Sequence, residues 1–230
     1  YGRKKRTYKR RPMRKFGRRR GYRANAVVSR SSPLPDRFFT RLKYSDAYTI
    51  TYTGFQTPVH YVFNVNSIYD PNYSGLGHQP YCHDQFQALY NRYRVYGCKY
   101  QVTFSNTSTT DYSEASVVLR PNNINLTNQQ TVRENPYCVH KITLAPEGSG
   151  RSTTTVRGYA SVSKLRGVSK RAVSTENDYA ALMGSTPNIV PTIQIYHYNA
   201  TNAGTASPLY FRIDLEYYTC FYDRKNLSQS

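Results

Sequence analysis

The sequence predicts an all-β domain, a sandwich or barrel, behind a strongly basic N-terminal segment. Short runs rich in Tyr, Thr and Val recur from Tyr44 onward, and these residue types favour strands. Ala and Leu, which favour helices, are sparse, and Asn, Ser, Thr, Gly and Pro interrupt the chain throughout. The length of 230 residues lies within the range of one large all-β domain.

Residues 1–23 form a basic arm that differs in composition from the rest of the chain. They hold 13 of the 32 Lys and Arg residues and none of the 13 Asp and Glu residues. We expect this arm to be disordered or extended without a partner, because its like charges repel and nothing apolar opposes them. Residues 24–43 are interpreted as a linker, since the run Ser-Ser-Pro-Leu-Pro favours an extended chain.

Residues 44–230 form the predicted globular domain, in which eight segments have the pattern of strands. The clearest runs from residue 209 to 222, where apolar side chains from Leu209 to Leu215 alternate with polar ones, as in a half-buried strand. In residues 92–106, strict alternation places Tyr93 and Val95 opposite Cys98 and Tyr100. The eight segments are residues 44–53, 59–65, 92–106, 114–120, 137–145, 153–163, 191–200 and 209–222. Eight strands joined by turn-rich loops indicate a sandwich or barrel.

Two short helices are also expected within this domain. Residues 84–93 place Phe86, Leu89 and Tyr93 at helical spacing. Residues 174–184 begin with Ser and Thr, which favour helix N-termini, and end at Gly184, which favours a C-terminus. No internal repeat of solenoid length is evident.

The segment from residue 63 to 104 has the most distinctive sequence motifs in the chain. It contains Asn66-Ser67-Ile68-Tyr69-Asp70-Pro71, then Gly75-x-Gly77-His78-Gln79-Pro80, a short helical stretch over residues 84–90, and Tyr93-x-Val95. It resembles the capsid proteins of circular Rep-encoding single-stranded DNA viruses, which are circovirus-like proteins. The resemblance implies a single eight-stranded jelly roll made of two facing four-stranded antiparallel sheets. It also implies self-assembly of about sixty copies into a small icosahedral T=1 shell around a circular single-stranded DNA genome.

The basic arm is the main predicted nucleic-acid-binding site. Arg binds phosphate in a bidentate manner, and the interleaved aromatic residues can stack on single-stranded bases. Binding is expected to be electrostatic and insensitive to sequence, the alternative being a merely solvated charged tail. The predicted contact residues are Arg3, Lys4, Lys5, Arg6, Lys9, Arg10, Arg11, Arg14, Lys15, Arg18, Arg19, Arg20 and Arg23.

A second basic cluster lies in residues 163–171. Lys164, Arg166, Lys170 and Arg171 are candidates for a further DNA contact on the inner face of the shell. A receptor-binding patch and a plain solvated surface are the alternatives. Unlike the arm, this cluster has no aromatic neighbours in the sequence.

No residue is predicted to be catalytic or to bind a metal, and no cofactor is expected. Several polar residues with suitable side chains lie close together in the sequence: Asp70, His78, Cys82, His83 and Asp84. Side chains of these types can form a Cys/His nucleophile or a metal site. Their neighbours are Pro and Gly residues typical of turns, so we interpret the polar side chains as loop-fixing or interfacial. The four Cys residues are widely spaced and are expected to be reduced.

These observations predict a viral capsid protein that packages single-stranded DNA through its arm and is not an enzyme. The basic runs at residues 3–6 and 9–15 also fit a nuclear localisation signal, so we expect the protein in the virion and in the host nucleus during assembly. Nuclear import receptors and a host attachment receptor are further expected partners, without membrane insertion. The alternatives are a non-capsid nucleic-acid-binding β protein with a basic tail, and a jelly-roll enzyme or lectin.

Overall fold

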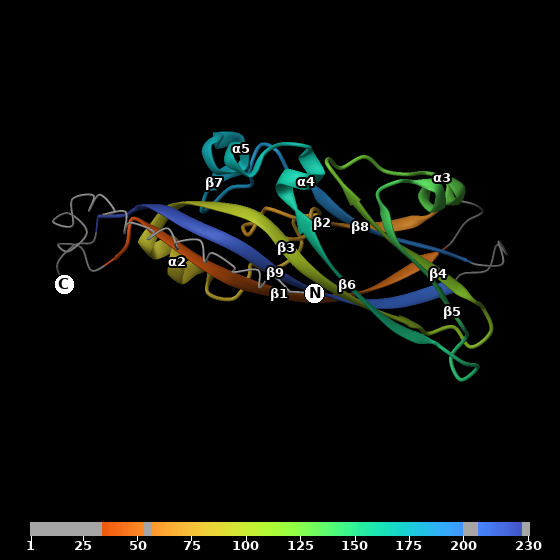
Figure 1. Cartoon of the computed structure of the whole chain (residues 1–230). Helices are drawn as coiled ribbons and strands as arrows, with labels where there is room; N and C mark the ends of the chain where they lie inside the picture. Colours follow the sequence, from red (N-terminus) through yellow and green to blue (C-terminus); the bar gives the residue numbers. More distant parts are fainter. Residues whose placement is uncertain (1–33, 53–56, 200–206, 227–230) are drawn as a thin grey trace, which may run out of the picture. The chain divides into compact units, whose positions relative to one another are not determined.

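The computed structural model describes residues 34–52, 57–199 and 207–226, and it contains two facing antiparallel sheets (Figure 1). The larger sheet has the strand order β1 (Arg37–Tyr52), β9 (Ser207–Arg224), β3 (Tyr90–Asn106), β6 (Thr153–Ser161), and the short β7 (Ala180–Leu182) also pairs with β3. The smaller sheet has the order β2 (Val59–Asn64), β8 (Thr192–Asn199), β4 (Ser113–Arg120), β5 (Cys138–Leu144). The predicted jelly roll is therefore confirmed. The arm and residues 24–33 of the predicted linker lie outside the described residues.

The main core lies between the two sheets because the strands alternate apolar and polar side chains. In β9, Leu209, Phe211, Ile213 and Leu215 are buried as predicted, while the side chains between them point outward. Phe211 lies against aromatic rings of three other strands, including Phe63 of β2 and Phe104 of β3. These contacts join the inner faces of both sheets into one core.

β1 begins earlier than the sequence pattern indicated. Its pairing with β9 starts at Arg37, opposite Tyr222, so residues 37–43 of the predicted linker belong to the sheet. β1 is an edge strand of the larger sheet, and the carboxylate of Asp46 lies on its inner side. The hydroxyls of Tyr44 and Tyr48 both donate hydrogen bonds to that carboxylate, at 2.8 Å for Tyr44.

A β-bulge in β3 overturns the strict alternation expected for residues 92–106. The register with β9 shifts between Val95 and Gly97, which leaves Tyr96 as an extra residue. As a result Tyr93 and Val95 lie on the same buried face as Cys98 and Tyr100, not opposite them. A bulge depends on the partner strand, so a single-strand pattern does not reveal it.

The core contains an unusual number of Tyr residues, and hydrogen bonds satisfy most of the buried hydroxyls. Tyr217 donates to the Asn64 carbonyl at 2.9 Å, and Tyr93 donates to the Ser185 carbonyl at 2.8 Å. The largest fully buried side chains include Tyr44, Tyr52, Tyr90, Tyr93, Tyr196, Tyr198 and Tyr217. A single copy therefore buries many of its 24 Tyr residues without help from a neighbour.

The outer face of the smaller sheet is covered by the connection between β4 and β5, which includes α3 (Gln129–Glu134) (Figure 1). Val132 of α3 packs on Val118, Tyr196 and Tyr198, which point away from the main core. Arg133 donates through Nε to the Glu114 carboxylate at 3.0 Å. The outer face of the larger sheet is different, because solvent reaches it. Along β1 and β6, every second side chain points outward and is exposed, and those between them point inward and are more buried. Among the described residues, this is the open face of the domain.

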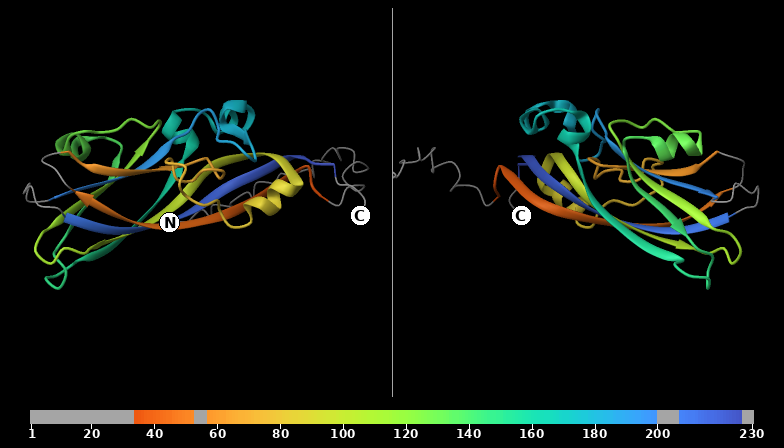
Figure 2. Two further views of the ribbon diagram at one scale, coloured as in Figure 1. Left: turned by 180° about the vertical axis from the view of Figure 1, so that it is seen from behind. Right: turned by 45° about the vertical axis from the view of Figure 1, so that its right-hand side comes forward.

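Short helical segments complete the described part of the fold, and one prediction about them is wrong. α2 (His83–Leu89) agrees with the helix predicted near residue 84, and α4 (Val162–Arg166) follows β6 directly. The helix predicted over residues 174–184 is not formed. That region holds the end of α5 (Lys170–Thr175), the 3-10 turn Asn177–Tyr179, and β7 (Figure 2).

The reason for this difference lies in the capping and in the pairing of the segment. The Ser169 side chain accepts a hydrogen bond from the Ala172 N–H at 3.0 Å, so α5 starts before the predicted Ser174. Ala181 and Met183 are buried whereas Leu182 between them is exposed, which is the period of a strand. Pairing with β3 therefore overrides the local helical preference.

Among the described residues no helix has the length and apolarity of a membrane-spanning segment.

Candidate nucleic-acid interface

Two of the four cations predicted in residues 163–171 lie together in one hollow. Lys164 and Lys170 line a depression of about 440 Å³ with Tyr96 and Tyr159. The cluster has no aromatic neighbours in the sequence, but the fold places these two Tyr rings beside it. The bulge turns Tyr96 outward, and β6 presents Tyr159 beside the start of α4.

The other two cations of the predicted cluster lie elsewhere. Arg166 donates through Nη1 to the Pro121 carbonyl at 3.0 Å, so it fastens the end of β4 to α4. Arg171 is exposed and is not among the residues that line the hollow. The 13 predicted residues of the arm lie outside the described residues, and their contact with nucleic acid stays a prediction.

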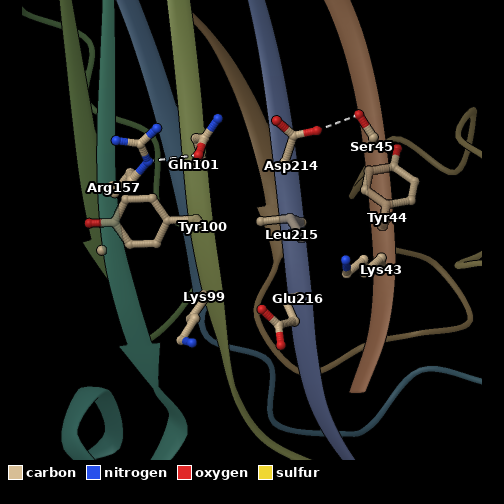
Figure 3. Close-up of a pocket in the computed structure, with 11 residues that line it drawn as sticks. Lys43, Tyr44, Ser45, Lys99, Tyr100, Gln101, Arg157, Asp214, Leu215 and Glu216 are labelled. Atoms are coloured by element: carbon tan, nitrogen blue, oxygen red, sulfur yellow. Dashed lines mark hydrogen bonds between the residues drawn. The ribbon is translucent and has the colours of Figure 1, made fainter.

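A second hollow, of about 460 Å³, lies on the open face of the larger sheet (Figure 3). Strand register builds it, since Glu216 of β9 is paired with Lys43 of β1 on one side and with Lys99 of β3 on the other. In the next row, Asp214 of β9 is likewise paired with Ser45 and Gln101, and Gln101 with Arg157. Charged residues far apart in sequence therefore form neighbouring rows.

The carboxylates in this hollow are engaged by neighbours on the same face. Asp214 accepts from the Ser45 hydroxyl at 2.6 Å, and Glu216 forms an ion pair with Arg41 at 3.2 Å. A third hollow, of about 300 Å³, is lined by Arg37 and Arg94 and shares Tyr96 with the Lys164 hollow. Across the three hollows, seven cationic side chains face two carboxylates. The open face is therefore positively charged and suited to an anionic partner.

Aromatic rings lie among these cations. The guanidinium of Arg41 is 5.0 Å from the centre of the Tyr218 ring, and the ammonium of Lys99 is 5.6 Å from it. Hydrogen bonding to Tyr218, with the nearby charge of Glu216, raises the pKa of Lys99. The Tyr159 ring meets Tyr218 nearly at a right angle, with 5.6 Å between their centres.

Not every cation on this face is available to a ligand. Arg94 is buried, and it donates to the carbonyls of Val173 and Glu176 at 2.9 and 3.0 Å. It also lies 5.7 Å from the centre of the Tyr222 ring. We interpret Arg94 as a structural residue that fixes α5 to the edge of the sheet.

The polar residues that suggested catalysis are tied into loop structure. His78 contacts two backbone carbonyls, those of Gln79 at 2.8 Å and Ser45 at 3.0 Å. His83 contacts Asp84 at 3.3 Å, with the His83 side chain buried. In residues 34–52, 57–199 and 207–226, no three His, Cys, Asp or Glu side chains gather as a metal site requires. The four Cys residues are free thiols, and Cys98 and Cys220 are buried.

Sequence reasoning missed the cations on the larger sheet. Alternation places Lys99 with Gln101 and Thr103 on one face of its strand, whereas Lys43 falls in the predicted linker. What the sequence lacks is the register that brings β1, β3 and β6 together across β9.

Comparisons with solved structures find similar folds in viruses, at low identity. A chain of Desmodium yellow mottle tymovirus is 12% identical over 86% of this chain and 95% of that chain, with a TM-score of 0.44. Turnip yellow mosaic virus gives 10% identity over 86% and 87% of the two chains, with a TM-score of 0.45. The nodavirus of the prawn Macrobrachium rosenbergii gives 13% over 86% and 100%, with a TM-score of 0.43. Likenesses at this level assign neither family nor function.

Comparisons of the sequence alone add nothing to this. No protein-family model matches the chain, and no curated protein matches it.

Proposed function

We propose that this chain is the coat protein of a small single-stranded DNA virus. In this proposal its jelly roll forms the wall of an icosahedral shell of about sixty copies, and its basic arm binds the packaged genome. The observation on which the proposal depends is the combination of two parts in one chain. A segment with 13 cations and no acid in 23 residues precedes a two-sheet jelly roll.

Three features support this assignment over a catalytic one. The two sheets form the architecture common in shell walls, and one face of the larger sheet is open and cationic. The sequence motifs of residues 63 to 104 resemble those of circovirus-like capsid proteins. The polar loop residues near His78 contact backbone and neighbouring side chains and do not converge on a common point.

The arm is proposed to bind DNA by charge and not by base sequence. Arg and Lys neutralise phosphates and release counterions, which gives strong binding that salt weakens. Free copies repel one another through their arms, and genome binding relieves that repulsion, so packaging and assembly are coupled. The same basic runs are proposed to direct the protein to the host nucleus before assembly.

The test replaces the 13 Lys and Arg residues of the arm with Gln in the full-length chain. Particles of this variant should contain little nuclease-protected DNA, while circular dichroism of the body stays unchanged, because the 13 substitutions lie outside the folded domain. The matched control keeps all 13 cations in scrambled order and should package DNA like the natural chain. Equal DNA content in the Gln variant would contradict the proposal. The two variants also report nuclear import, since a fluorescent fusion of the Gln variant should remain outside the nucleus.

The alternative is a non-capsid nucleic-acid-binding β protein with the same arm. It predicts a monomer or dimer at every protein concentration and a preference among base sequences. Negative-stain microscopy with and without nuclease distinguishes the two, because uniform closed particles are expected only of a coat protein.

A further inference from the structure

We infer that the open face of the larger sheet holds a second binding site for single-stranded nucleic acid. In this site Tyr159 provides the ring on which a base stacks, and Lys99, Lys164 and Lys170 contact the flanking phosphates. The inference rests on the proposed function for its ligand, which is the nucleic acid gathered by the arm. It adds a site in the folded domain that is made of residues outside the arm.

Tyr159 has the position and the support that a stacking ring needs. It points outward from β6, an edge strand of the larger sheet, and is 49% exposed. Its hydroxyl end lies against Gly97, where an added Cβ would come within 2.6 Å of the Tyr159 oxygen. Tyr218 meets its ring from the side. The ring is thus held before any ligand arrives, which lowers the entropy cost of binding.

Cations lie on both sides of this ring. Lys99 is its register partner on β3, and its ammonium faces the neighbouring hollow shown in Figure 3. Lys164 and Lys170 line the other hollow together with Tyr159 itself. The nearest carboxylate of the β9 row, Glu216, is paired with Arg41. A phosphodiester chain that crosses Tyr159 would therefore meet positive charge before and after the stacked base.

The shape of the site and its chemistry favour a single strand over a duplex. The Lys164 hollow of about 440 Å³ is within the range of sites for small organic groups, about 300–1,000 Å³. Stacking requires an unpaired base, and a base in a duplex does not expose its flat face. The one side-chain amide in the neighbouring hollow, Gln101, already accepts from Arg157 at 2.7 Å. The site therefore has little means to read base edges, and tolerance of sequence is expected.

The site and the arm belong to one chain, so binding at the second of them is intramolecular once the first is occupied. This covalent link raises the effective concentration of a bound strand at the site in the folded domain, and a weak site would become occupied.

The experiment uses the full-length chain with its arm intact and a 20-nucleotide oligothymidylate that carries 5-iododeoxyuridine. After irradiation, peptide mapping should find cross-links at Tyr159 as well as in the arm. Tyr137, which is 41% exposed and lies just before β5 of the other sheet, is the internal control and should not react. Cross-links confined to residues 1–33, or equal yields at Tyr159 and Tyr137, would overturn the inference.

Matched variants separate stacking from structure. Tyr159→Phe keeps the ring and should bind like the natural chain, whereas Tyr159→Leu should bind the oligonucleotide roughly 5-fold to 10-fold more weakly. Tyr137→Leu should have no effect. Equal affinity of the Leu and Phe variants, both with unchanged circular dichroism, would contradict the role of Tyr159.

A variant with two Lys residues replaced by Gln tests the phosphate contacts. Lys99→Gln combined with Lys164→Gln should lower the slope of log affinity against log salt by about 1.4, because each phosphate contact on a single strand contributes about 0.7. Lys141→Gln, an exposed change on β5, should leave the slope unchanged. An unchanged slope in the double variant would refute this site while leaving packaging by the arm intact. If instead the variant with Gln in place of the 13 Lys and Arg residues of the arm packages DNA normally, the proposed function fails whatever the cross-links show.

Discussion

At the scale of single residues, the hydrogen bonds of His78 define its charge state. Both ring nitrogens lie near backbone carbonyl oxygens, which only accept, so both can donate only when the ring is an imidazolium. The Gln79 carbonyl raises the pKa of His78, burial opposes it, and the Ser45 carbonyl and the Asp46 carboxylate add to the rise. The centre of the His78 ring also lies 4.7 Å from the centre of the Tyr44 ring, and this contact joins the loop to β1.

This arrangement predicts a pH-dependent contribution to stability with a defined sign. The pKa of His78 is higher in the folded than in the unfolded chain, so its stabilisation is complete below about pH 6.5 and is lost as pH rises through the raised pKa. His78→Gln should therefore reduce the free energy of unfolding more at pH 5 than at pH 8.5. The difference should be about 0.5 kcal/mol, because His78 is exposed and solvent screens its charge.

The measurement is chemical denaturation of both proteins at each pH, with the difference taken between them. Burial lowers the pKa of His60, His140 and His197, and these groups act in the opposite direction. They are common to both proteins, so they cancel in the difference. A difference that is constant with pH, or larger at pH 8.5, would show that His78 is not charged in the folded loop.

At the scale of elements, α3 makes the outer face of the smaller sheet a second apolar cluster. Val132 is fully buried there. Val132→Ala should lower the free energy of unfolding by about 1–2 kcal/mol, since it removes two methyl groups from a packed site. The matched control is Val139→Ala on β5, which is 44% exposed and should cost less than about 0.5 kcal/mol. Equal losses in urea denaturation would mean that α3 does not pack tightly on the sheet.

How far the sequence predicts these elements depends on whether the signal is local. Composition and alternation within single segments predicted the eight main strands, and the buried side chains of Leu209 and Phe211 agree with the predicted alternation. The bulge at Tyr96 and the strand β7 depend on pairing with other strands, so the pattern of one segment could not show them. The same limit applies to the candidate site. The arm is visible as a run of charge, whereas the face around Tyr159 exists only once four strands are in register.

At the scale of the whole molecule, charge governs association. The chain has a formal net charge of +19 at neutral pH, and such self-repulsion keeps copies apart. Without nucleic acid, purified protein should remain dispersed at low ionic strength and associate when salt is raised, because the Debye length falls from about 30 Å at 0.01 M to about 3 Å at 1 M. Light scattering across a salt series, with and without oligonucleotide, measures this. Assembly at low salt without any polyanion would show that the body contacts outweigh the repulsion.

The edge strand β1 has a consequence for how copies can join. It is 16 residues long, and an uncovered flat edge of that length invites strands from other molecules and leads to fibrils. A loop covers part of this edge, because the Tyr81 N–H donates to the Lys43 carbonyl at 3.2 Å and His78 contacts the Ser45 carbonyl at 3.0 Å. The carboxylate of Asp46 on its inner side, and Arg41 and Lys43 on its outer side, oppose such addition. Addition of further strands to β1 in a continuous, amyloid-like sheet is thus disfavoured, which leaves side-chain contacts as the route by which copies can join.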